Sequence, residues 1–167
     1  YYSDEFLDMV GQGLTTMWNY DMKIDSEGNI HVVLQLGSVS ENSEIYYCDD
    51  NGHDNGSGWY HFKASFDDLL SSDDPEDWNW DYSKVVSGAY TWCFYNPDGD
   101  SYVRDSQAQL AFDRDDDELV YIVADLGVPG EDTFEDGSHD YGSQWSQDIF
   151  IFRSEDNGQS WWNPLNV

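Results

Sequence analysis

Basic residues are scarce in this sequence. Only six Lys and Arg stand against 35 Asp and Glu, which gives a formal net charge of −29. DNA or RNA binding through phosphates needs clustered Lys and Arg, so a nucleic-acid-binding role is all but excluded. Self-repulsion on this scale destabilises a compact chain unless salt or bound cations screen it. Two interpretations follow: an acidic surface suited to seawater or brine, or a charge that is partly used to bind Ca²⁺.

Long apolar runs and cysteines are also few. No apolar run approaches the roughly 18 residues that indicate a membrane-spanning helix. The two cysteines, Cys48 and Cys93, can form a disulfide in an oxidising compartment or remain as unpaired buried thiols. A zinc site is not indicated, because there is no CxxC pair and the four His are scattered along the chain.

Aromatic residues, in contrast, are abundant. They make up 17% of the sequence, with eight Trp and twelve Tyr, and this argues against a disordered acidic segment. A chain of 167 residues is long enough for one domain with a real core. It starts at Tyr1 without a signal peptide and stops at Val167 within a strand-like stretch, so we expect a fragment or mature portion of a longer protein.

Alternation and β-branched residues predict strands separated by polar turns. The strongest predicted strands are 30–36, 118–124 and 148–153. The acidic stretch 65–81 reads as a long loop in which Phe66–Leu70 can form one helical turn. Two units of four antiparallel strands can be aligned, with Ile30 matching Leu119 and Ile45 matching Ile149.

A tight turn with a strand on each side is predicted at 154–161. Gly158 can adopt positive φ, Asp156 can accept backbone N–H groups two residues on, and Trp161 can anchor the turn in an apolar layer. With Ser154 and Ser160, these residues match S-x-D-x-G-x-S-W, which resembles the Asp-box or BNR repeat of sialidases and other secreted β-propellers. In that family the box is a structural turn between the third and fourth strands of a blade, so the resemblance implies fold more than activity.

An expanded, degenerate copy of the same motif is predicted earlier in the chain. Asp50 and Gly52 take the places of Asp156 and Gly158, and Trp59 takes the place of Trp161 after a longer spacer.

The resulting fold prediction is all-β, with antiparallel four-stranded β-propeller blades and Asp-box turns. About two blades are present, so the propeller is partial. The predicted division is an N-terminal edge segment at 1–14, a blade at 15–65, an acidic connection with a strand or hairpin at 66–103, and a second blade at 104–167. Two blades cannot close a ring, so further chain or partner molecules are expected to cover the open faces and edges.

Two kinds of ligand site are predicted besides the structural turns. Alternating carboxylates at Asp113, Asp115 and Asp117 suit Ca²⁺, which takes six to eight oxygen ligands, although chance clusters are common in so acidic a chain. Aromatic residues in or beside polar loops can stack on sugar rings or pack between blades. Packing between blades is the commoner role of such residues in propellers. These residues are Trp78, Trp80, Trp145 and Trp162.

The predicted function is a non-catalytic propeller segment of a secreted or cell-surface protein, with a binding or scaffold role and a glycan as a candidate partner. The alternative is a structural subunit of an extracellular assembly. A sialidase-like glycoside hydrolase is disfavoured: the resemblance implies three arginines holding the substrate carboxylate, whereas the only arginines are Arg104, Arg114 and Arg153, and no F/Y-R-I-P motif is present.

Overall fold

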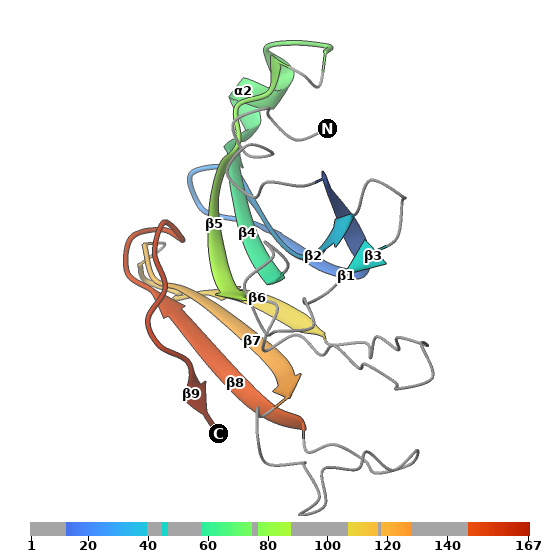
Figure 1. Ribbon diagram of the computed structural model, residues 1–167. Coiled ribbons are helices and arrows are strands. Elements are labelled where there is room, and N and C mark those ends of the chain that lie inside the picture. The colour runs from blue at the N-terminus through green and yellow to red at the C-terminus, as the bar shows by residue number, and fades with distance from the viewer. Residues whose placement is uncertain are drawn as a thin grey trace, which may run out of the picture.

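Two antiparallel sheets make up most of the described structure. The computed structural model describes residues 13–39, 45–46, 58–74, 77–87, 107–116, 118–127 and 147–167. Within these residues strands predominate, which confirms the prediction of an all-β structure. The two sheets lie against each other as layers, and helix α2 lies at one end of the first sheet, away from the second (Figure 1).

The first sheet is a meander in which each long strand pairs with the next one along the chain. Its order is β1 (Gly13–Ile24), β2 (Asn29–Val39), β4 (Gly58–Ser65) and β5 (Asp81–Ser87). The two-residue β3 (Ile45–Tyr46) pairs with the end of β2. The strand predicted at 30–36 lies within β2, as expected from its β-branched residues.

A single helical turn links β4 to β5. Helix α2 (Phe66–Leu70) is confirmed as predicted. Ser65 caps it, because its Oγ accepts a hydrogen bond from the Asp68 N–H at 3.3 Å, and two acidic residues in the first turn suit the positive end of the helix dipole.

The second sheet is also a four-stranded antiparallel meander. Its strands are β6 (Ala108–Phe112), β7 (Val120–Gly127), β8 (Gln147–Ser154) and β9 (Leu165–Asn166). The strands predicted at 118–124 and 148–153 fall on β7 and β8.

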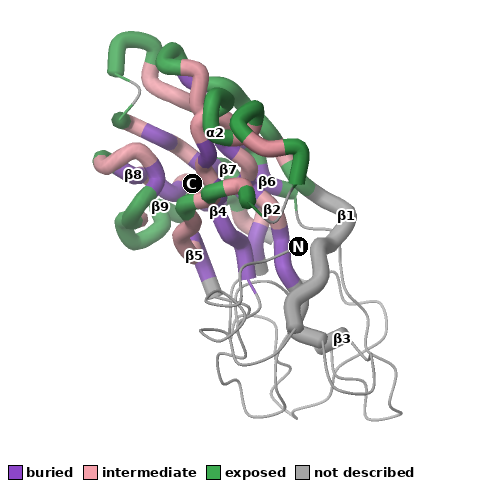
Figure 2. The backbone as a smooth tube through the Cα atoms, turned by 90° about the horizontal axis from the view of Figure 1, so that it is seen from above, coloured by how far each residue is buried: buried purple, intermediate pink, exposed green. Residues whose placement is uncertain are grey.

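The main core lies between the two sheets. Val33 and Trp59 of the first sheet are buried with Ile122 and Phe152 of the second, and all four are at most 1% exposed. Figure 2 shows buried backbone along the central strands and exposed backbone around α2. A smaller cluster of Leu36, Tyr60 and Phe62 lies on the other face of the first sheet.

The internal repeat is present, but its predicted alignment was wrong by one residue in the second strand. The first hairpin closes with Ile24 opposite Ile30, and the second closes with Phe112 opposite Val120. Ile30 therefore corresponds to Val120 and not to Leu119. The turn in the second sheet is longer than the turn in the first, and this shifts the match.

The third strands were also matched incorrectly. Ile45 lies in β3, which pairs only with the end of β2, while β4 occupies the position that β8 has in the second sheet. Phe62 opposite Val32 thus corresponds to Phe152 opposite Ile122. The sheet also includes Asp81–Ser87 as its fourth strand, whereas the prediction placed this segment in the connection at 66–103.

With this alignment, the two sheets pack through non-equivalent faces. The face of the first sheet that carries Val33 and Trp59 is buried, but the corresponding residues of the second sheet, Val123 and Ile149, are 36% and 51% exposed. Conversely, Met22 is 54% exposed, whereas its equivalent Leu110 is buried in the core. The packing is therefore head to tail. It leaves apolar side chains of β1 in the first sheet, and Val123 and Ile149 in the second, exposed.

Candidate functional site

The turn at 154–161 is built around the carboxylate of Asp156. Asp156 Oδ1 accepts hydrogen bonds from the Ser154 hydroxyl at 2.7 Å and from the Ser160 N–H at 2.8 Å. Asp156 Oδ2 accepts from the Ser160 hydroxyl at 2.5 Å. Burial opposes ionisation, but these hydrogen bonds outweigh it and hold the pKa of Asp156 below its ordinary value. The prediction that Asp156 bonds to its own turn is confirmed.

Two residues of this turn have left-handed backbone conformations. Asn157 has φ 57° and Gly158 has φ 84°. The buried Ser154 hydroxyl closes the turn by accepting the Gly158 N–H at 2.8 Å. Glycine is favoured at 158 for a second reason, since a Cβ there would lie 2.1 Å from His61 Cε1 of the first sheet.

The turn is thus a contact between the two sheets as well as a connection within one. The Gly158 carbonyl accepts hydrogen bonds from the Ser83 hydroxyl at 2.5 Å and from His61 Nδ1 at 3.2 Å. The Trp161 indole N–H donates to Ser83 Oγ at 2.8 Å, and its ring meets His61 edge to face. Trp161 is partly buried against the main core, so the predicted burial of this side chain is only partial.

A buried polar chain continues from this contact through the first sheet. His61 Nε2 lies 2.9 Å from His31 Nδ1, and His31 Nε2 lies 3.1 Å from Asp25 Oδ2. Asp25 also accepts two hydrogen bonds from Asn29, through its N–H at 2.8 Å and its side-chain amide at 2.7 Å. The three titratable side chains are each at most 7% exposed. The chain therefore links the β1–β2 turn to the Gly158 carbonyl.

The hydrogen-bond pattern assigns the protons in this chain. Because Gly158 O can only accept, His61 carries its hydrogen on Nδ1, and its Nε2 accepts from His31. His31 then donates from Nδ1, and its Nε2 faces the Asp25 carboxylate, so the two form an ion pair when His31 is protonated. Burial and the positive charge of His31 lower the pKa of His61 to about 3. Hydrogen bonds from Asn29 and His31 outweigh burial and lower the pKa of Asp25.

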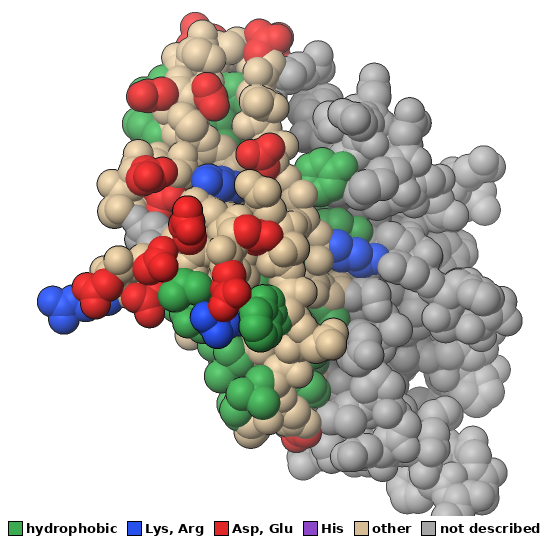
Figure 3. Space-filling view, turned by 90° about the vertical axis from the view of Figure 1, so that its left-hand side faces the viewer, with side chains coloured by type: hydrophobic (Ala, Val, Ile, Leu, Met, Phe, Trp, Pro, Cys, Tyr) green, Lys and Arg blue, Asp and Glu red, His purple; other side chains and the backbone are tan. Residues whose placement is uncertain are grey.

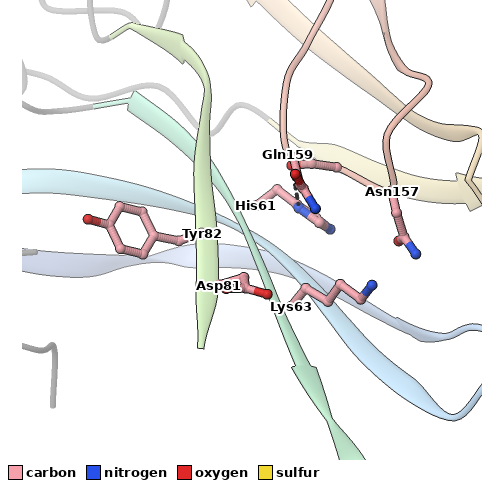
Figure 4. Close-up of a pocket in the computed structure, with 7 residues that line it drawn as sticks. His61, Lys63, Asp81, Tyr82, Asn157 and Gln159 are labelled. Atoms are coloured by element: carbon pink, nitrogen blue, oxygen red, sulfur yellow. Dashed lines mark hydrogen bonds between the residues drawn. The ribbon is translucent and has the colours of Figure 1, made fainter. Parts of the chain in front are cut away.

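A cleft lies beside this junction. It has a volume of about 320 Å³, and β4, β5 and the turn at 154–161 form its walls. Figure 4 shows Lys63 and Asn157 reaching toward the same side of the cleft, Asp81 beside the stem of Lys63, and the Tyr82 ring directed away. His61 also lines the cleft, but both of its nitrogens already have protein partners, so this imidazole is not free to act as a base on a bound molecule.

Only Trp59 of the predicted degenerate motif lies within the described residues. Trp59 lies within β4 opposite Gln35, and the strand continues on both sides of it. Its side chain is 1% exposed. Trp59 therefore does not follow a turn at the end of the third strand, as Trp161 does. Asp50 and Gly52 lie outside the described residues.

The predicted calcium ligands are only partly described. Asp113 caps its own turn, because its Oδ1 accepts the Asp115 N–H at 3.0 Å. Asp117 lies outside the described residues, within which no group of three potential metal ligands occurs. Calcium binding by Asp113, Asp115 and Asp117 stays a prediction.

The predicted stacking residues are dispersed. The Trp78 indole N–H donates to the Ser72 carbonyl at 3.0 Å, and Trp80 packs on the smaller apolar cluster. Trp162 is exposed and carries Arg153 over its ring at 5.4 Å. Trp145, like Cys48, Cys93 and Arg104, lies outside the described residues.

The sequence analysis did not predict a role for His31, His61 or Ser83. Polar residues on the core-facing side of otherwise apolar strands are the signal that could have indicated a buried hydrogen-bonded chain of side chains.

Among the described residues, no helix is long and apolar enough to cross a membrane. Comparison of the sequence with protein families finds no match, and comparisons with curated proteins and with solved structures find no significant match either.

Proposed function

We propose that the two sheets are consecutive blades of a β-propeller segment, that the turn at 154–161 is an Asp-box, and that the segment is a non-catalytic scaffold or binding module of a secreted or cell-surface protein. The observation that carries this proposal is the head-to-tail packing of repeated sheets. A contact between non-equivalent faces repeats in the same sense with every added unit, and it forms a ring when the rotation closes.

Exposed apolar side chains on β1 support the same interpretation. On the first sheet, Tyr20, Met22 and Ile24 are exposed at positions whose equivalents in the second sheet contact the core. A further sheet placed there would repeat the packing already seen between the two sheets. The role of Arg153 also supports a structural assignment, because Arg153 pairs with Glu155 at 2.5 Å and stacks on Trp162.

This interpretation is tested by placing a charge among the exposed side chains of β1. Met22→Glu should leave the melting temperature of the chain nearly unchanged, whereas Leu110→Glu, at the equivalent buried position, should unfold it. If a neighbouring sheet is added through a longer version of the chain, Met22→Glu should become strongly destabilising. If Met22→Glu has an equally small effect on the melting temperature of this chain and of the longer version, the propeller assignment is wrong.

Two further measurements separate the alternatives. Turnover of a fluorogenic sialoside that is lost on mutation of Arg104 or Arg153 would favour a glycoside hydrolase over a scaffold. Regular filaments of the purified chain, seen by electron microscopy, would favour a structural subunit whose open edges pair with neighbouring copies.

A further inference from the structure

The cleft at the junction of the two sheets holds polar groups that the packing of the sheets does not use. We propose that this cleft is a binding site for a neutral sugar residue, with Lys63 and Asp81 on one wall and the amides of Asn157 and Gln159 on the other. The inference goes beyond the proposed function. It does not rest on ring closure either, because every lining residue belongs to the two described sheets or to the turn between β8 and β9.

The first wall offers a cation beside a carboxylate. Lys63 on β4 and Asp81 on β5 are register partners at the cleft. Within the described part of the chain, neither side chain forms an ion pair or a hydrogen bond. An ammonium group only donates and a carboxylate only accepts, whereas a hydroxyl does both. Adjacent sugar hydroxyls can therefore satisfy both side chains at once.

The second wall offers two amides from the turn at 154–161. Asn157 and Gln159 flank Gly158, and each amide can donate and accept. Asn157 Oδ1 is buried and has no hydrogen-bond partner among the described residues. Such orphaned acceptors are uncommon in folded proteins, and a rotation of this amide would bring its oxygen to a ligand hydroxyl.

The remaining lining groups narrow the class of ligand. Both His61 nitrogens and the Gly158 carbonyl already have partners, so the four side chains must supply the contacts. The Tyr82 ring points away from the cleft and offers no stacking face (Figure 4). Recognition thus depends on hydrogen bonds at a partly exposed site, for which we expect millimolar affinity.

Charge favours a neutral ligand over an anionic one. The net charge of −29 repels sialic and uronic acids from the whole surface, and one lysine does not reverse that field. A zwitterion such as glycine could pair with Lys63 and Asp81, but it would leave both amides without matched partners. A neutral sugar satisfies all four side chains.

The test is a titration of the full 167-residue chain, followed by amide NMR, with neutral methyl glycosides of glucose, galactose, mannose and N-acetylglucosamine. At least one of them should shift the Asn157 and Gln159 signals saturably, while glucuronic acid, sialic acid and glycine should not. Lys63→Met and Asp81→Asn should each weaken binding about tenfold or more, equivalent to about 1.4 kcal/mol. Lys84→Met is the matched control, because Lys84 lies over the Tyr60 ring on the opposite face of the sheet.

Each other outcome contradicts the proposal. Absence of saturable shifts with every neutral glycoside would remove the site. Binding that survives both Lys63→Met and Asp81→Asn would place the ligand elsewhere. Binding of the acidic sugars or of glycine as strong as that of the neutral ones would overturn the ligand class. Unchanged melting temperatures of the variants show that lost binding does not come from unfolding.

Discussion

Gly158 shows how one residue can meet two separate requirements. Its φ of 84° is a conformation that disfavours a side chain, and its Cα hydrogens face the His61 ring at a distance that leaves no room for a Cβ. Gly28 shares the first requirement, with φ 86°, but not the second, because nothing lies within 4 Å of a Cβ built there. Comparing substitutions at the two glycines therefore distinguishes the cost of backbone strain from the cost of a steric clash.

We expect Gly28→Ala to cost about 1 kcal/mol of unfolding free energy, from backbone strain alone. Gly158→Ala should cost about 3 kcal/mol or more, because the new methyl group must also displace His61 and with it the contact between the sheets. Urea denaturation of both variants and the unmodified chain measures the difference. Equal costs at the two positions would mean that the contact between Gly158 and His61 is looser than described.

At the scale of the elements, the contact between the sheets combines an apolar core with a buried polar chain. The hydrogen-bonded chain of polar side chains occurs in the first sheet only. When the two sheets are aligned by their hairpins, Tyr121 and Ile151 occupy the positions of His31 and His61 in the second sheet. A buried ion pair contributes little net stability, but it disfavours any other register, because a shifted sheet would leave a charge unpaired. The Asp25–His31–His61 chain thus helps to fix how the first sheet meets the turn at 154–161.

The Asp25–His31–His61 hydrogen bonds should make the contact between the two sheets sensitive to acid. The pKa of His61 is about 3 in the folded chain and ordinarily 6.5, so between these values the unfolded chain binds a proton that the folded chain excludes. The contribution of His61 to stability is therefore complete above about pH 6.5 and is lost as the pH decreases toward 3. Asp25 and Asp156, whose pKa values are lowered from 3.8, add to the loss at the acid end.

His61→Gln should remove the contribution of the imidazole, because an amide can accept from His31 and donate to the Gly158 carbonyl without titrating. Between about pH 7 and pH 4, we expect the unmodified chain to lose on the order of 3 kcal/mol more unfolding free energy than His61→Gln. Urea denaturation at each pH provides the measurement. Parallel pH profiles for the two proteins would show that His61 titrates normally.

For the whole molecule, the dominant electrostatic feature is repulsion between acidic side chains. Asp and Glu side chains are scattered over the face shown in Figure 3, with few Lys and Arg among them. Salt screens such repulsion and should stabilise the compact chain.

We expect NaCl to raise the melting temperature, and an equal rise with CaCl₂ at the same ionic strength would mean that screening alone stabilises the chain. A larger rise with Ca²⁺ than with Na⁺ would instead support a calcium site at Asp113, Asp115 and Asp117. Scanning calorimetry at matched ionic strengths distinguishes screening from site binding.

Local patterns in the sequence are sufficient to predict several elements of this protein. Alternation and β-branching identify the strands at 30–36, 118–124 and 148–153, and turn chemistry identifies the carboxylate-centred turn at 154–161. Helix α2 follows from similarly local signals, because its cap and its acidic first turn are adjacent in the chain. These elements form from interactions between residues that are close in sequence.

Contacts between residues that are far apart in the sequence depend instead on how the two sheets pack. The register that aligns Ile30 with Val120 depends on the length of each hairpin turn, which the apolar pattern does not specify. His61 and Gly158 meet across the sheets, and so do Asp21 and Leu110, whose backbone N–H donates to Asp21 Oδ2 at 2.9 Å. Such contacts are selected by the packing of whole faces, so no local pattern in the sequence predicts them.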